Sequence, residues 1–309
     1  MEFDKERKGT GTAEWAEVNE NICRGCQNNC LYCYAAYNAN RFGQRDRANW
    51  SREELTQRAE IQAYPAKNGV IMFPSSHDIT PFNLDAYIRV AKLILEKGNK
   101  LLIVSKPRLF CVEKIVEELE PYLKQILFRF TMGTVQESVS LLWEPGAPLP
   151  RERRECLALA YGRGFNTSVS IEPMLEGSQM TEILVEWVRE FVSETIWIGR
   201  MNKPQLRVPK SHAYLVDGIL KLQNDDQIMD LYEWFKDDGM IRWKDSIKTV
   251  VEMQKSNIVP HYEVKPGQPC SHPGCANHIT HPCEGCGRIA AMGARLPACR
   301  NSSGEGRWW

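Results

Sequence analysis

The sequence predicts an α/β fold whose parallel strands form a partial barrel, and three observations support this. Apolar runs rich in β-branched and aromatic residues alternate along the chain with segments of helical periodicity. The runs contain few polar positions, as expected for strands buried on both faces of a parallel sheet. About six strand-helix units occur within residues 15–258, which fits a partial (β/α)6 TIM-like barrel better than a β-sandwich.

The first expected strand spans residues 17–22, directly before a group of cysteines. Five more strands follow in chain order as apolar runs ended by polar or turn-forming residues: GVIMFPSS, KLLIVSKP, QILFRFTMG, FNTSVSIEP and ETIWIGR. In barrels of this type the loops after the strands carry the chemistry. The residues that follow each run are therefore the first candidates for a functional site.

Helical periodicity is clearest after the second of these strands. Five apolar residues fall on one face of the expected helix: Leu84, Tyr87, Ile88, Ala91 and Leu95. Asn83 is placed to cap its start and Gly98 to end it. A capping box from Ser51 to Glu54 predicts another helix that begins at Ser51. Further helices are expected at 111–124, 151–163 and 180–193.

The charge of the chain is balanced, with 39 Lys and Arg and 39 Asp and Glu among 309 residues. No global basic field therefore indicates nucleic acid, although a local basic groove is compatible with this composition. The first residues, MEFDKERKGTGTAEW, contain no apolar signal segment, and no apolar run is long enough to span a membrane. We expect a cytoplasmic protein without a membrane partner, and the sequence leaves its oligomeric state open.

Eleven cysteines, an odd number in a chain of this kind, indicate metal binding or catalysis rather than a disulfide framework. Cys111 and Cys156 stand alone and are interpreted as small buried hydrophobic residues on helices. The others form two dense groups, one near each end of the chain.

The first group, in NICRGCQNNCLYCYA, follows the first expected strand. Three of its thiols have the spacing C-x3-C-x2-C: Cys26, Cys30 and Cys33. Three thiolates on one loop can hold three corners of a 4Fe–4S cluster, whereas zinc would need a fourth ligand, which Cys23 could supply. The position after a barrel strand and the neighbouring aromatic residues Tyr32 and Tyr34 favour the cluster.

These residues resemble the radical S-adenosylmethionine superfamily, whose motif is C-x3-C-x2-C with an aromatic residue just before the third cysteine. Further segments resemble, in order, the branch of spore photoproduct lyase and DNA repair photolyase: GCQNNCLYCYA, SSHDITPFN, LLIVSKP, WEPGAP and VSIEPMLEG. The resemblance covers roughly residues 15–250. It leaves Cys23 as a bystander in the preceding strand.

The resemblance implies a radical enzyme. Its 4Fe–4S cluster would bind S-adenosyl-L-methionine at the open iron and cleave it reductively to a 5′-deoxyadenosyl radical, which abstracts hydrogen from a substrate. An electron donor such as flavodoxin or ferredoxin would be a partner. The branch points to nucleic acid as substrate, in repair or modification by a lyase or a modifying enzyme. Peptide or small-molecule modification and a non-catalytic iron–sulfur or zinc protein are the alternatives.

The resemblance also implies where the cosubstrate binds. Ser75 and Asp78, in SSHD, fall where the family places its amine-binding segment, although this sequence lacks the usual glycines. Lys106, in VSKP, matches a Thr-Lys segment of the branch and is the expected partner of the cosubstrate carboxylate; otherwise it is an exposed lysine at a strand end. Tyr32, before the third cysteine, completes this part of the cofactor-binding set.

Polar residues near the ends of the later strands are further candidates. Ser168 and Ser170 alternate along the fifth strand and point to one side, where Ser170 could reach the ribose or simply fill the barrel core. Glu172 and Arg200 are candidate substrate or cosubstrate contacts, or they pair with one another. Trp197 is interpreted as a core residue.

The second cysteine group lies in PCSHPGCANHITHPCEGCGR, with two knuckles formed by four residues: Cys270, Cys275, Cys283 and Cys286. Four thiolates in this arrangement suit tetrahedral zinc, and an auxiliary iron–sulfur cluster would use the same ligands. We expect residues 259–309 to form a small loop-rich C-terminal metal-binding module after the barrel of residues 15–258.

Overall fold

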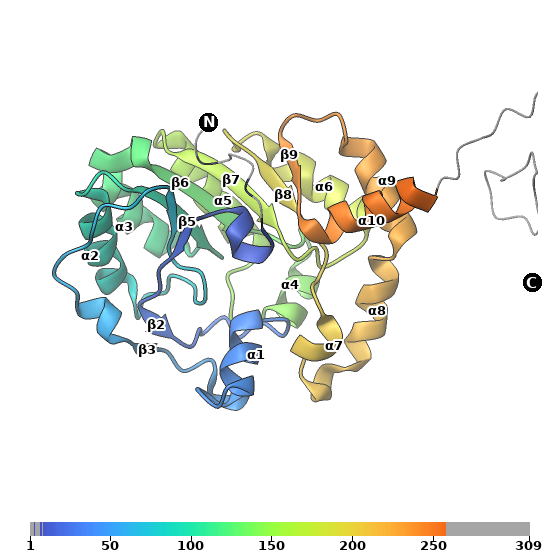
Figure 1. Ribbon diagram of the computed structural model, residues 1–309, viewed down its shortest axis with the longest axis horizontal. Helices are drawn as coiled ribbons and strands as arrows, with labels where there is room; N and C mark the ends of the chain where they lie inside the picture. The colour runs from blue at the N-terminus through green and yellow to red at the C-terminus, as the bar shows by residue number, and fades with distance from the viewer. Residues whose placement is uncertain (1–2, 4–6, 8, 258–309) are drawn as a thin grey trace, which may run out of the picture. The chain divides into compact units, whose positions relative to one another are not determined.

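The computed structural model describes residue 3, residue 7 and residues 9–257 (Figure 1). Met1–Met253 form one compact unit. The four cysteines expected to bind metal after residue 269 lie outside the described residues, and the division into 15–258 and 259–309 stays a prediction. Within the described part, no helix combines the length and the apolar composition that crossing a membrane requires.

The main sheet has seven parallel strands and curls into a half-barrel (Figure 1). Its strands lie in chain order from one edge to the other: β1 (Val18–Asn19), β4 (Val70–Met72), β5 (Lys100–Ser105), β6 (Ile126–Thr131), β7 (Asn166–Ile171), β8 (Ile196–Ile198) and β9 (Ile241–Trp243). The predicted α/β partial barrel and its parallel pairing are confirmed. The six predicted strands are present, and β9 is an addition to them.

Helices follow most of the strands: α1 (Tyr34–Arg41), α2 (Leu84–Leu95), α3 (Leu109–Leu119), α4 (Glu137–Trp143), α5 (Pro150–Gly162), α6 (Ser178–Arg189), α7 (Pro204–Arg207), α8 (Tyr214–Leu222), α9 (Asp225–Phe235) and α10 (Asp245–Asn257). The two faces of the sheet have different cores, because alternate residues of one strand face opposite sides. Ile126, Phe128 and Phe130 of β6 belong to the core between the sheet and the helices. Leu127 packs with Trp15 and Trp197 on the inner face of the half-barrel.

The helix predicted to begin at Ser51 is not there. Residues 51–53 lead into the short strand β3 (Glu54–Leu55), which pairs antiparallel with β2 (Cys23–Arg24). A capping box needs the Glu54 carboxylate to reach back to the chain, but this carboxylate forms an ion pair with Arg45 at 2.7 Å instead. Asn83 does precede α2, yet its side chain bonds Thr80 rather than the helix.

The N-terminal segment, defined as residues 9–17, covers the inner face of the half-barrel, where Figure 1 draws its blue 3-10 turn (Gly11–Glu14) in front of the sheet. Trp15 meets Trp197 edge to face, with ring centroids 5.9 Å apart. The fully buried Lys244 donates to the Gly11 carbonyl at 2.8 Å and pairs with Glu14 at 3.1 Å. The interpretation of Trp197 as a core residue is confirmed.

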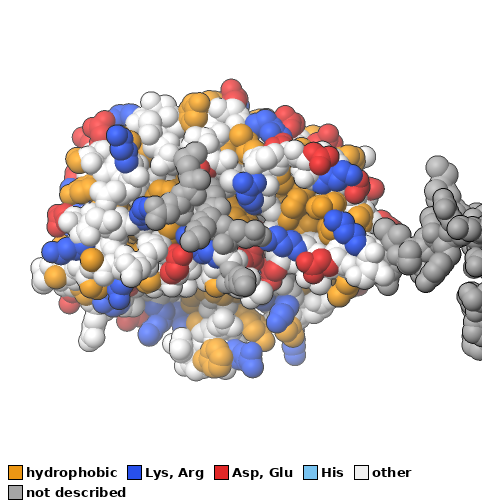
Figure 2. Space-filling model, turned by 45° about the horizontal axis from the view of Figure 1, so that its top comes forward, with side chains coloured by type: hydrophobic (Ala, Val, Ile, Leu, Met, Phe, Trp, Pro, Cys, Tyr) orange, Lys and Arg blue, Asp and Glu red, His pale blue; other side chains and the backbone are white. Residues whose placement is uncertain are grey.

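Acidic and basic side chains are interspersed on the face of the molecule drawn in Figure 2. This mixture agrees with the zero formal charge of the chain. Any electrostatic attraction for a charged partner must therefore come from a local group of residues rather than from the molecule as a whole.

Candidate cofactor and substrate site

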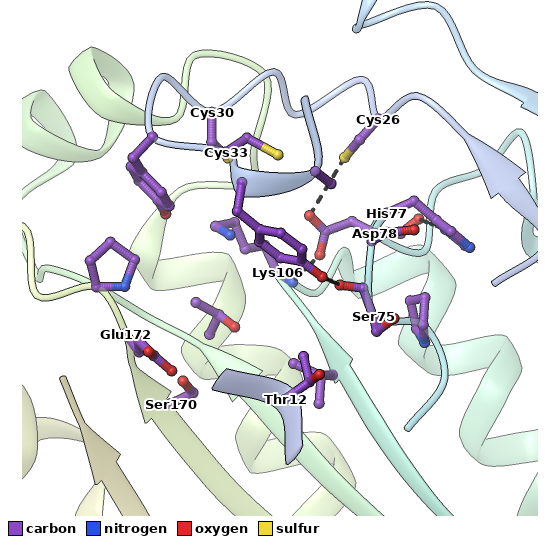
Figure 3. A pocket seen from close by; sticks show the side chains of 18 of the residues that line it. Thr12, Cys26, Cys30, Cys33, Ser75, His77, Asp78, Lys106, Ser170 and Glu172 are labelled. Atoms are coloured by element: carbon purple, nitrogen blue, oxygen red, sulfur yellow. Dashed lines mark hydrogen bonds between the residues drawn. The ribbon is translucent and has the colours of Figure 1, made fainter. Parts of the chain in front are cut away.

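A cavity of about 310 Å³ lies where the strands of the half-barrel end. Its walls come from the loop before α1, the segments after β4, β5, β7 and β8, the inner strand β6 and the N-terminal segment. Figure 3 shows cysteines on one side of this cavity and Ser170 and Glu172 on another. The loops after the strands thus carry the polar groups, as the barrel architecture predicts.

The three cysteines of the C-x3-C-x2-C motif all line the cavity, and Cys26 and Cys30 are buried. Cys33 caps α1, because its Sγ accepts the Ala36 N–H at 3.4 Å. Arg47 holds the loop from behind by donating to the Cys30 carbonyl at 3.0 Å. The loop is therefore fixed at its middle and at its junction with α1, and its three cysteines lie on one side of the cavity (Figure 3).

Cys23 does not line the cavity. The sequence predicted that Cys23 lies in the first barrel strand. This strand, β1, ends at Asn19, and Cys23 lies on β2 instead. Its Sγ contacts the carbonyls of Arg24 at 3.7 Å and Gly25 at 3.9 Å. The thiol thus contacts the adjacent backbone and, unlike the other three, does not face the cavity.

Burial raises the pKa of the Cys30 thiol to about 12. Burial also raises the pKa of Cys26, with a further contribution from the negative charge of Asp78, and it raises that of Cys33. Such thiols ionise only beside compensating positive charge, which bound iron or zinc supplies. Among the residues that the structure describes, no three His, Cys, Asp or Glu side chains converge on a single metal ion. A cluster instead takes one thiolate at each iron, so the three cysteines fit it as a donor set.

Asp78 ties three parts of the cavity together. One carboxylate oxygen accepts hydrogen bonds from the Lys106 N–H at 2.6 Å and the Ser105 hydroxyl at 3.0 Å, and the other accepts from Asn28 at 2.8 Å. Burial opposes its ionisation, but the charge of Lys106 and these hydrogen bonds outweigh it and lower the pKa of Asp78. The carboxylate is therefore ionised and orders the wall of the cavity next to Cys26.

The segment before Asp78 is held by Asn21. Its side-chain oxygen accepts the Ser75 N–H at 2.9 Å, and its nitrogen donates to the Ser75 hydroxyl at 2.8 Å. Tyr34 donates to the Ser75 carbonyl. His77 is buried and accepts the Ile22 N–H at 3.2 Å, so its ring supports the backbone. These hydrogen bonds fix the backbone before Asp78. The segment is therefore held in place although it lacks the glycines expected there.

Lys106 lines the cavity and its side chain is 12% exposed, so the alternative of an exposed strand-end lysine is wrong. Its Nζ lies 5.6 Å from the centre of the Tyr32 ring and 3.8 Å from a Glu144 oxygen. Burial disfavours its charge, but the electrostatic interactions with Cys30, Glu144 and Asp78 outweigh burial and raise its pKa. Lys106 thus keeps a positive charge inside the cavity.

Glu144 is the centre of a buried charge network that sequence reasoning missed. Its carboxylate accepts hydrogen bonds from the Tyr32 hydroxyl and from Arg153, and both Glu144 and Arg153 are buried. Burial opposes its ionisation, but the charges of Arg153 and Lys106 lower the pKa of Glu144. Glu144 lies in WEPGAP, one of the segments that carry the family resemblance. The resemblance gave no role to Glu144 itself.

Ser170 lines the cavity, and its buried hydroxyl has no hydrogen-bond partner within the described residues. Ser168, two positions earlier, donates to the Thr195 carbonyl at 2.6 Å and accepts from Arg129 at 3.0 Å. The two serines therefore differ: Ser168 belongs to the core, whereas Ser170 can bond a ligand. An unmade hydrogen bond at a buried hydroxyl is costly, so this orphan fits a hydroxyl-bearing ligand.

Glu172 and Arg200 both line the cavity but do not pair with one another. Glu172 lies 3.4 Å from Lys244, and Arg200 lies 3.1 Å from Asp225. The suggested ion pair between Glu172 and Arg200 is therefore wrong. Each of the two side chains pairs with a residue from the last part of the fold, which local sequence patterns do not indicate. Cys111 and Cys156 are buried on α3 and α5 as predicted, and neither lines the cavity.

Comparison with known proteins gives distant matches. No protein-family model matches the chain. A curated protein of Acidianus two-tailed virus, the uncharacterized protein ORF301, is 27% identical over 194 residues, which are 58% of this chain and 63% of that protein. The match thus spans less than two thirds of the viral relative.

Two groups of solved structures are similar. An alanine variant of spore photoproduct lyase matches with a TM-score of 0.49 and 14% identity, over 77% of this chain and 78% of that chain. SuiB of Streptococcus suis, bound to its precursor peptide SuiA, matches with a TM-score of 0.43 and 12% identity, over 60% of this chain and 40% of that chain.

Proposed function

We propose that this protein is a radical S-adenosylmethionine enzyme of the spore photoproduct lyase-like branch. The observation that carries the proposal is the meeting of the three motif cysteines with Lys106 and the orphan hydroxyl of Ser170 in one cavity. A three-thiolate site with an adjacent cation and a free hydroxyl is the set of groups that a cluster and its zwitterionic cosubstrate require.

Each residue then has a role. Cys26, Cys30 and Cys33 would hold the 4Fe–4S cluster, which supplies the electron for reductive cleavage of the cosubstrate. Lys106 would bind the carboxylate of the methionine part, and Ser170 a ribose hydroxyl. Ser75 and Asp78 would accept hydrogen bonds from the amine, since an ionised carboxylate retains acceptor capacity beyond the bonds it already makes.

Tyr32, which also lines the cavity, would help to position Lys106, because its ring lies 5.6 Å from the Lys106 Nζ and its hydroxyl donates to Glu144. Flavodoxin or ferredoxin is the class of electron donor proposed. For the substrate we favour nucleic acid over a peptide or small molecule, because segments near the cavity resemble a branch that acts on DNA.

Anaerobic reconstitution with iron and sulfide tests the proposal. The protein should develop the visible absorbance of an iron–sulfur cluster and, with reductant, convert S-adenosyl-L-methionine to 5′-deoxyadenosine and methionine. A colourless protein that binds zinc through these cysteines would contradict it and support a non-catalytic metal protein.

Replacing Lys106 by methionine should weaken cosubstrate binding tenfold or more. Loss of one charge-assisted hydrogen bond to a carboxylate costs about 1.5 to 3 kcal/mol, while the methionine stem preserves the packing against Tyr32. Isothermal titration of the reconstituted protein measures the dissociation constant. Iron content should not change, and Lys114→Met on the exposed face of α3 is the matched control. Equal affinities in the two variants would exclude Lys106 from the cosubstrate site.

We also propose that residues 259–309 form a module with its own metal. Thiolate binding would contribute its free energy directly to local folding. Metal analysis of the triple variant Cys26→Ala, Cys30→Ala, Cys33→Ala should therefore still find about one zinc per chain, or about four irons if the second site is a cluster. A triple variant without either metal would mean that Cys270, Cys275, Cys283 and Cys286 are free thiols.

A further inference from the structure

Arg207 is a cation in the cavity wall that neither the motif nor the cluster needs. It ends the short helix α7 and lines the cavity half-buried. Its guanidinium lies over the ring of Tyr34, 5.9 Å from the ring centre. Within the described part of the chain it makes no hydrogen bond and no ion pair, so its five donors are available to a ligand.

The local fold holds Arg207 in this position. Lys203 adopts a left-handed conformation with φ 52°, and its carbonyl accepts the Arg207 N–H at 3.2 Å. On either side of the exposed residues of α7, Pro204 and Val208 are buried, and Val208 packs in the same apolar cluster as Cys30 and Tyr32. The helix is thus anchored next to the cysteine loop, with α1 beside it (Figure 1).

The charge of Arg207 is poorly compensated. Burial lowers its pKa, although the negative charge of Glu172 opposes this change. The other arginines near the cavity have partners: Arg200 pairs with Asp225, Arg153 with Glu144, and Arg108 donates to Asn28 at 2.7 Å. Burying half of a charged side chain without a counter-ion costs free energy. This cost indicates that Arg207 binds an anion.

The sequence around Arg207 is basic in a chain that is neutral as a whole. Residues 199–213, GRMNKPQLRVPKSHA, contain no acidic residue and four basic ones: Arg200, Lys203, Arg207 and Lys210. Lys203 and Lys210 are exposed. A planar guanidinium suits bidentate binding of a phosphate group, and an aromatic ring beside it suits a neighbouring base.

We propose that Arg207, backed by Tyr34, binds a phosphate group of the substrate. This inference rests on the proposed function, because it takes the cavity to be the place where cosubstrate and substrate meet. The phosphate can belong to a nucleic-acid strand or to a small phosphorylated molecule, and both would present the same chemistry to the guanidinium.

Binding without reductant tests the site separately from catalysis. A fluorescein-labelled oligothymidine strand is titrated with wild type, Arg207→Gln, Arg207→Lys and the control Arg151→Gln, whose side chain on α5 is 83% exposed. Fluorescence anisotropy gives the dissociation constant at several salt concentrations. In parallel, thymidine monophosphate and thymidine are titrated by calorimetry.

Arg207→Gln should raise the dissociation constant of the strand about tenfold and reduce the salt slope by about one, as expected for one lost phosphate contact. Arg207→Lys should keep part of the affinity, and Arg151→Gln should change it less than about twofold. If the loss affects thymidine monophosphate and spares the strand, the phosphate belongs to a small molecule.

The proposal is overturned if neither phosphate ligand binds the wild type, or if Arg207→Gln and Arg151→Gln behave alike with both ligands. Cosubstrate cleavage in the absence of substrate is measured on the same preparations. Failure of the wild type in that assay would remove the proposed function, and the binding comparison would still decide whether Arg207 is a phosphate site.

Discussion

Changing Cys26, Cys30 or Cys33 singly to alanine is expected to abolish both the iron–sulfur absorbance and the cleavage of S-adenosyl-L-methionine. A cubane that loses one of three protein ligands is no longer held, and the three thiols are presented by one loop around one cavity. Iron analysis, the visible spectrum and the yield of 5′-deoxyadenosine measure the effect after anaerobic reconstitution.

Cys23→Ala is the matched control, since Cys23 is also buried and close in sequence but faces its own backbone. It should keep the iron content and the cleavage activity. If Cys23→Ala lost the cluster as completely as Cys26→Ala, the assignment of the ligands would be wrong and Cys23 would be a fourth ligand of the cluster.

Glu144→Gln is expected to reduce the free energy of unfolding by about 3 to 5 kcal/mol, because it leaves Arg153 as a buried charge without its counter-ion. Arg153 is only 1% exposed, and its remaining contacts are neutral oxygens, such as the Pro148 carbonyl at 2.7 Å. The same change should loosen Tyr32 and Lys106, which both contact Glu144. Guanidinium unfolding of the purified protein measures the loss.

Glu155→Gln provides the comparison for this experiment. Glu155 also pairs with an arginine, Arg151 at 3.6 Å, but both side chains are more than half exposed. Exposed pairs contribute little, so this variant should differ from wild type by less than about 0.5 kcal/mol. Similar losses in the two variants would show that the buried network does not stabilise the fold.

The parts of the fold that could be predicted are those with a strong local pattern. Four of the six residues of β6 are apolar, and this run indicated a strand buried on both faces, which the structure confirms for all six residues. β9 was missed because its three residues include Arg242 and no longer apolar run surrounds them, unlike the equally short β8. The capping box at Ser51 was misleading because the carboxylate of Glu54 found a stronger partner in Arg45.

The site divides in the same way. The cysteine spacing and the strand-end position of Lys106 are local, and the structure brings these residues to one cavity. The partners of Glu172 and Arg200 are not local, since Lys244 and Asp225 come from later elements. Arg207 lies in a loop-rich stretch without periodicity, where only the excess of basic residues over acidic ones was a usable signal.

The contact between Lys244 and the Gly11 carbonyl joins residues separated by 233 positions in the chain. During synthesis, residue 11 leaves the ribosome long before residue 244, so Trp15 has no complete inner core to enter until the last strands are made. Contacts of such long range form slowly. The loop that carries Cys26, Cys30 and Cys33 therefore emerges before its cavity exists, and the proposed cluster would reach its final surroundings only after the half-barrel is complete.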